Sequence, residues 1–171
     1  MKHGQTPSQT VGPFFAYGLT PEQYGYPFTQ IASGRIEAQG DKIKITGQVL
    51  DGNGDPVVDA LVEIWQPDIG FARQGTGTRS DCSFEFETVK PSALADGAPH
   101  INVIVFMRGL LSHLYTKVYF EDEAAANAVD DVLLAVPKDR RATLIAKATQ
   151  AGQYRFDIQL QGDNETVFFN L

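Results

Sequence analysis

Apolar and polar residues alternate along several short stretches of the chain, and this period of two indicates half-buried β-strands. In residues 42–50, Ile43, Ile45 and Val49 share one face. The stretch 57–66 is apolar on both faces, which predicts a strand in the middle of a sheet. Further strands are predicted at 83–89, 100–107, 114–120, 143–148 and 154–161, with turns between them. The series predicts an all-β protein, a two-layer β-sandwich.

The pattern predicts one short helix, over residues 122–135, in which Asp122 can cap the N-terminus and after which Pro137 ends the helix. Residues 1–40 contain aromatic residues and turn formers without a sustained period, which indicates an extended N-terminal arm. The arm either wraps its own domain or reaches a partner chain, and both possibilities remain open. We therefore expect an arm at 1–40 and one sandwich domain at 41–171.

Composition and charge narrow the possible partners. A hydrophobic content of 43% is too high for a disordered chain, and 171 residues suit one domain. The net charge of -7 argues against nucleic acid or an acidic membrane surface as a partner. Cys82 is the only cysteine, and the first residues lack the apolar stretch of a secretion signal. We expect a cytoplasmic protein that binds small molecules and other proteins.

The strand predicted at 100–107 begins with His100 and places Asn102 on the same face. Two histidines in this arrangement would present both imidazoles to one metal ion, but an amide oxygen is a poor ligand for iron, zinc or copper. The chain has three histidines and no coherent carboxylate cluster. We expect no catalytic metal in this chain, and His100 by itself is typical of a hydrogen-bonded core histidine.

Arg108 and Gly109 follow the end of the same strand. An arginine at a strand end can hold a carboxylate through two parallel hydrogen bonds. The alternative is an ordinary surface arginine, and the spacing alone favours that alternative.

Several motifs together resemble those of the intradiol ring-cleaving dioxygenase family. The segment Val62-Glu63-Ile64-Trp65-Gln66-Pro67-Asp68, the Lys90-Pro91 step and Ala98-Pro99-His100-Ile101 are specific for it. The resemblance covers essentially the whole chain, because it extends to the segments 6–13, 45–60, 108–109, 154–158 and 165–169. It implies the β-sandwich of the intradiol dioxygenase type.

The resemblance also implies where the metal lies. Active chains of this family bind Fe(III) through two tyrosines and a His-x-His pair. Here Phe71 stands at the first tyrosine position, residues 92–94 contain no second tyrosine, and Asn102 replaces the second histidine. Phe71, His100 and Asn102 are thus expected to be a remnant of the iron site. The family pattern implies that Fe(III) is bound by a homologous beta subunit and that this chain holds no catalytic residue.

For this chain the resemblance implies a supporting function in a hetero-oligomer with that beta subunit. The residues that correspond to substrate-contacting positions are Thr10, Gly12, Pro13, Phe14 and Arg108. The implied substrates are O2 and the small aromatic acid protocatechuate, whose ring is cleaved between its two hydroxyl-bearing carbons. A self-sufficient transthyretin-like β-sandwich binding module is the alternative function.

Overall fold

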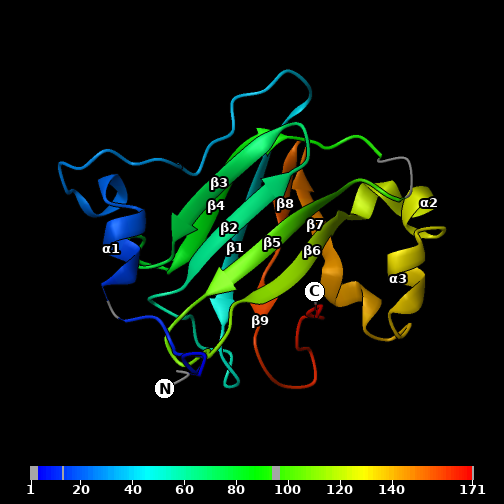
Figure 1. Cartoon of the computed structure of the whole chain (residues 1–171). Helices are drawn as coiled ribbons and strands as arrows, with labels where there is room; N and C mark the ends of the chain where they lie inside the picture. The colour runs from blue at the N-terminus through cyan, green and yellow to red at the C-terminus, as the bar shows by residue number, and fades with distance from the viewer. Residues whose placement is uncertain (1–3, 13, 94–96, 171) are drawn as a thin grey trace.

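The computed structural model describes residues 4–12, 14–93 and 97–170. Within these ranges, nine strands form one mixed sheet in the order β3-β2-β5-β6-β7-β8-β1-β4, and β9 pairs with β1 (Figure 1). The all-β class is confirmed, and the two layers are the two halves of one sheet that nearly closes on itself. The strands are β1 (Lys42–Leu50), β2 (Leu61–Gln66), β3 (Gly70–Gly75), β4 (Ser83–Val89), β5 (His100–Phe106), β6 (Leu114–Phe120), β7 (Ile145–Gln150), β8 (Gln153–Arg155) and β9 (Ile158–Gln159).

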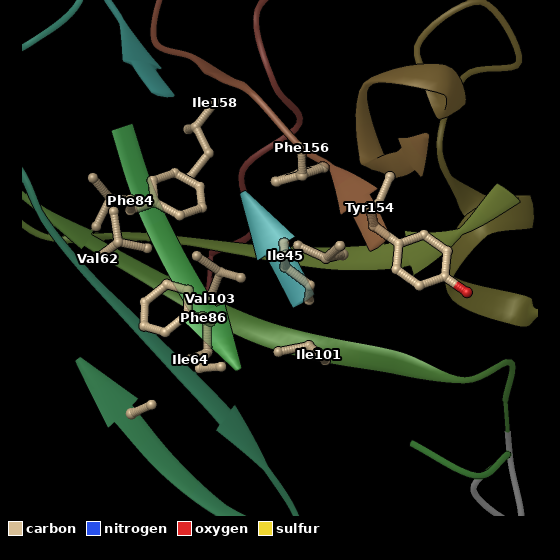
Figure 2. Packing of buried hydrophobic residues seen from close by; sticks show 14 of the residues in the cluster. Ile45, Val62, Ile64, Phe84, Phe86, Ile101, Val103, Tyr154, Phe156 and Ile158 are labelled. Atoms are coloured by element: carbon tan, nitrogen blue, oxygen red, sulfur yellow. The ribbon is translucent and has the colours of Figure 1, made fainter. Parts of the chain in front are cut away.

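The main hydrophobic core lies between the two halves of the sheet. Figure 2 shows Val62, Ile64 and Val103 from β2 and β5 facing Ile45 and Phe86 from β1 and β4. The alternation expected in β1 is confirmed, because its core-facing positions are buried while the positions between them are partly exposed. The opposite face of β2, β5 and β6 is therefore left for other contacts.

The strand predictions differ from the structure in several places, among them the stretch 143–148, where the strand is instead β7 at Ile145–Gln150. The stretch 57–66 forms a strand only from Leu61 onward, and the last predicted strand divides into β8 and β9, where Asp157 turns to accept a hydrogen bond from the Gln48 N–H. The sequence pattern misses β3 entirely. Its residues 70–75 are polar or glycine apart from Phe71 and Ala72, so they give no period-two signal.

The single helix expected at 122–135 is wrong. The region instead contains η2 (Glu121–Glu123), α2 (Ala124–Asn127) and α3 (Asp131–Ala135). Asp122 caps no helix, and its carboxylate accepts hydrogen bonds from the Lys90 ammonium and the Tyr154 hydroxyl. Asp130 interrupts the helix because its backbone is extended and its side chain caps α3. A fourth short element, η3 (Arg141–Leu144), precedes β7.

The N-terminal arm packs on its own domain. It forms α1 (Phe15–Leu19) and η1 (Glu22–Tyr24), which lie on the side of the sheet opposite α2 and α3 (Figure 1). The Gln23 side chain donates to the Gly75 carbonyl and accepts from the Gly75 N–H. The arm also supplies a short extended piece, residues 33–36, which we call the seam segment. Contact with a partner chain and the arm boundary at residue 40 stay predictions.

The seam segment lies where the two ends of the sheet approach each other. The Arg73 N–H of β3 donates to the Ser33 carbonyl at 2.9 Å. On the other side, the Glu87 N–H of β4 donates to the Gly34 carbonyl, and the Ile36 N–H donates back to the Glu87 carbonyl. Four residues of the arm thus satisfy backbone groups of both end strands and complete the closure of the sheet.

Within the described part of the chain, every helix falls short of the length and apolar character needed to cross a membrane.

Candidate functional site

The sequence-predicted site residues fall into two separate regions. In the first, the arm meets the loop that follows β5. The Thr10 hydroxyl accepts a hydrogen bond of 2.9 Å from the Gly109 N–H, which fixes the arm beside Arg108. Gly109 has a φ of +94°, a left-handed conformation that favours glycine at this turn. The structure therefore brings Thr10 and Arg108 together although they lie 98 positions apart in the sequence.

Arg108 forms an ion pair with a neighbouring carboxylate and still remains accessible to solvent. Its Nε forms an ion pair with the carboxylate of Asp59, and its side chain remains 54% exposed. Asp59 therefore orients the guanidinium plane without burying it. A guanidinium held in this way keeps its outer N–H groups directed toward solvent, where they can meet a carboxylate.

Gly12 and Phe14 lie at the start of α1. The Gly12 carbonyl accepts a hydrogen bond from the Phe15 N–H, and Phe14 is 74% exposed with its ring 5.6 Å from that of Tyr17. Pro13 lies outside the described residues. Phe14 thus lies at the surface and packs against Tyr17 of the arm.

The second region gathers the expected remnant of the iron site on the outer face of the sheet. A pocket of about 630 Å³ opens over β2, β3, β5 and β6. Phe71 and Asn102 line it, because each pairs with Trp65 in the middle strand β2. Asn102 also lies directly opposite Lys117 of β6, a neighbour that the sequence alone does not reveal.

His100 is buried next to this pocket, and both ring nitrogens have partners. Nδ1 lies 2.9 Å from the Ala98 carbonyl oxygen, so this nitrogen carries the proton. Nε2 is then the acceptor, and it lies 3.1 Å from the Lys117 ammonium. Burial, reinforced by the Lys117 charge, lowers the pKa of His100 against the opposing effect of the Ala98 hydrogen bond. The imidazole is held neutral and points at a lysine.

These residues do not fit a ferric ion. The Nε2 that would ligate a metal faces a cation, and Phe71 and Asn102 supply no anionic donor. Among the described residues, no three His, Cys, Asp or Glu side chains are grouped in a way that could hold a metal ion. The chemistry open to this pocket is binding by apolar contact, hydrogen bonds and a positive charge.

Sequence reasoning missed Lys117 and Asp59, the two charged residues that define these regions. Lys117 shares one face of β6 with Tyr115 and Tyr119, while the buried Thr116 and Val118 point to the core, so the period of two predicts that Lys117 lies on the outer face. Its position opposite Asn102 depends on the pairing register of β5 and β6. Asp59 lies in a loop whose distance from Arg108 has no signal in the sequence.

Comparisons with known proteins find similar chains. The protocatechuate 3,4-dioxygenase alpha chain of Burkholderia cepacia is 51% identical, and the match covers 98% of both chains. The alpha chain of Pseudomonas putida is 40% identical over 97% of this chain and 96% of its own. The protocatechuate 3,4-dioxygenase beta chain of Burkholderia cepacia is 30% identical over 76% of this chain and 68% of its own. No family model matches the sequence.

Solved structures share the fold. The dioxygenase domain of a dioxygenase carbohydrate-binding protein fusion from Streptomyces sp. SirexAA-E has a TM-score of 0.60 at 20% identity, covering 95% of this chain and 100% of that domain. An intradiol ring-cleavage dioxygenase from Tetranychus urticae has a TM-score of 0.58 at 16% identity, covering 91% and 94%. The architecture is therefore that of the intradiol dioxygenases.

Proposed function

The chain belongs to the protocatechuate 3,4-dioxygenase alpha chains, within the intradiol ring-cleaving dioxygenases, and we propose that it is the iron-free subunit that completes the substrate pocket of a beta subunit. The assembly cleaves protocatechuate with O2 between the two hydroxyl-bearing carbons and yields 3-carboxy-cis,cis-muconate. Fe(III) is bound by the beta subunit. The alternative of a self-sufficient transthyretin-like module receives no support from the relatives.

One observation supports the proposal that the beta subunit, and not this chain, binds the iron. His100 is what remains of the family's histidine pair, and its free ring nitrogen faces the Lys117 ammonium at 3.1 Å. A cation at this distance repels a metal ion from the nitrogen that would bind it. The chemistry of iron therefore belongs to a second chain, and homology between the alpha and beta chains supports a pair of similarly folded partners.

We assign substrate positioning to the first region. The exposed guanidinium of Arg108, oriented by Asp59, suits the carboxylate of protocatechuate. Thr10 brings the arm beside that arginine through its bond to the Gly109 N–H. Gly12 follows in the arm, and Phe14 offers an exposed ring that can form an apolar wall. Pro13 belongs to the same proposed set on the strength of the family motif alone.

The arm has a surface suited to a partner chain. Phe14, Tyr17, Tyr26 and Phe28 form a continuous row, with successive ring centroids 5.6, 5.9 and 6.1 Å apart. Phe14 and Phe28 are largely exposed, and Ile31 beyond them is 96% exposed. A row of exposed aromatic side chains is typical of a protein interface, because such residues supply most of the contact area at low entropic cost. The row supports assembly through the arm.

The iron assignment is tested by purifying the chain with and without a beta subunit. The chain alone is expected to carry far less than one iron per chain, and the co-expressed pair to carry iron in proportion to beta. Iron is measured by mass spectrometry and by absorption. A stoichiometric ferric ion with a tyrosinate-to-iron colour in the chain alone would refute the assignment, and failure of the two chains to co-purify would refute the assembly.

Arg108→Ala tests the positioning role in the reconstituted complex. Loss of a hydrogen-bonded ion pair with the substrate is worth about 1.5 to 3 kcal/mol, so kcat/KM for protocatechuate is expected to fall at least about tenfold. Iron content should not change. Arg79→Ala is the matched control, because Arg79 is also an exposed arginine with a carboxylate partner, Glu85. Equal kinetics for the two variants would show that Arg108 has a structural role only.

A further inference from the structure

The outer-face pocket has a chemistry that the proposed function does not use. We propose that it is a non-catalytic binding site for a small aromatic carboxylate, which the Lys117 ammonium beside His100 would hold. This inference goes beyond the proposed function, because it concerns a second site on this chain and requires neither iron nor turnover.

The walls of the pocket suit a single aromatic ring. Trp65 of β2 and Phe71 of β3 form one side, while Ile104 of β5, Tyr115 of β6 and Phe169 near the C-terminus form the rest. Phe169 is held there because its N–H donates to the Tyr115 carbonyl at 2.8 Å. Trp65 is 50% exposed, so a tryptophan surface is left open to a ligand. The volume of about 630 Å³ lies within the usual range for sites of small organic ligands.

The polar end of the pocket carries the Lys117 ammonium, which is influenced by the charge of Asp130 but is in no salt bridge within the described residues. Lys117 lines the pocket, and within the described ranges it forms no salt bridge with an Asp or Glu. Its recorded partner is the neutral Nε2 of His100. A partly buried ammonium with only a neutral partner retains a desolvation cost that a carboxylate can offset. The charge therefore selects an anionic ligand.

The ammonium contacts His100, and the residues around His100 are themselves held in place. His100 is fixed by its bond to the Ala98 carbonyl and by Tyr119, whose ring centroid lies 5.3 Å away. Asp130, the nearby carboxylate, accepts hydrogen bonds from the Tyr119 hydroxyl and two backbone N–H groups. Asn102 lies opposite Lys117 and lines the same pocket. Its amide N–H can therefore donate to the second oxygen of a bound carboxylate.

Trp65 provides the readout, because it is the only tryptophan in the chain and it lines the pocket. The full chain is titrated with benzoate while Trp65 fluorescence is followed, and a saturable change is expected. Benzamide, the neutral analogue of similar shape, is expected to bind at least tenfold more weakly. The absence of a saturable change with benzoate, or equal affinity for the two compounds, would overturn the proposal.

Lys117→Met removes the charge and keeps an apolar side chain of similar length. It is expected to raise the Kd for benzoate at least tenfold, whereas Lys147→Met, at an exposed lysine paired with Glu121, leaves the Kd unchanged. Circular dichroism shows whether Lys117→Met is folded. Ile104→Phe is a second variant, which keeps the charge but fills the pocket, and it is expected to weaken benzoate binding too. Unchanged binding by both pocket variants would overturn the site.

Benzoate binding to the outer-face pocket is also measured in the alpha-beta complex, by equilibrium dialysis with labelled benzoate. Replacing wild-type alpha by Lys117→Met is expected to remove one bound benzoate per alpha chain, and equal binding by the two complexes would contradict the proposal. Protocatechuate turnover is measured in parallel. Because turnover reports on the proposed function and the benzoate count on the outer-face pocket, the failure of either is recognised separately.

Discussion

Asp130→Ala is expected to lower the free energy of unfolding by about 3 to 5 kcal/mol. Asp130 is 2% exposed, and its carboxylate accepts three hydrogen bonds: from the Leu133 N–H at 2.8 Å, the Ala98 N–H at 2.8 Å and the Tyr119 hydroxyl at 3.2 Å. The first is the N-cap of α3, and the others attach that helix to the start of β5 and to β6. Alanine would leave all three donors without this acceptor.

Urea unfolding measures the effect, with Asp131→Ala as the control. Asp131 is the next residue, also acidic and in the first turn of α3, but it is exposed, so its loss should cost at most about 1 kcal/mol. Comparable losses for the two variants would show that helix-end charge, and not the buried hydrogen bonds, accounts for the stability.

The Asp130 contribution should also depend on pH. Burial opposes ionisation of Asp130, but the hydrogen bonds from Leu133, Ala98 and Tyr119 outweigh it and hold the pKa below its usual value. A carboxyl whose pKa is depressed on folding stabilises fully above its unfolded pKa of about 3.9, and the contribution is lost as pH falls through the folded pKa. The difference between wild type and Asp130→Ala should be constant near neutral pH and narrow below about pH 4.

Gly47→Ala is expected to cost more than about 3 kcal/mol, above the usual range for overpacking. A Cβ at this position of β1 would overlap the Phe156 carbonyl oxygen and lie 2.5 Å from Cζ of Phe84. The carbonyl cannot retreat easily, because the Phe156 N–H is bonded to the neighbouring Thr46 carbonyl at 2.8 Å. Phe84 is equally confined, being buried in the core shown in Figure 2.

Thermal and urea unfolding of Gly47→Ala, together with its soluble yield, test this expectation. Gly18→Ala is the control, since a Cβ at Gly18 in α1 meets no atom within 4 Å and alanine favours a helix. Gly18→Ala should therefore change stability by less than about 1 kcal/mol. A Gly47→Ala chain as stable as Gly18→Ala would mean that β1 and residue 156 can separate without loss of the fold.

Most strands were predictable, because one buried face imposes a period of two on the sequence. β1, β4 and β6 have the expected bounds, since apolar residues alternate through each. The same signal fails at β3, where Ala72 is the one fully buried apolar side chain. It also fails at Asp130, because the tertiary hydrogen bond to the Ala98 N–H, rather than local propensity, decides where the helix breaks.

The sequence suggests which residues to consider for the candidate site, but it does not reveal how they contact one another. The family resemblance implies that Phe71 and Asn102 stand at positions of metal ligands, and this assignment stays a prediction. The contact between His100 and Lys117 requires the register of β5 against β6, which long-range packing determines. The pairing of Arg108 with Asp59 similarly depends on how two loops meet at one end of the sheet.

The seam segment also bears on how the protein avoids self-association. Without residues 33–36, β3 and β4 would each present unsatisfied N–H and C=O groups along an open edge, a template on which strands from other molecules can add. By pairing with both edges, the arm protects them from strands of other molecules and so opposes aggregation. A chain shortened to begin at residue 40 would lose this protection at both edges at once, together with Ile36, which is a buried residue of the main core.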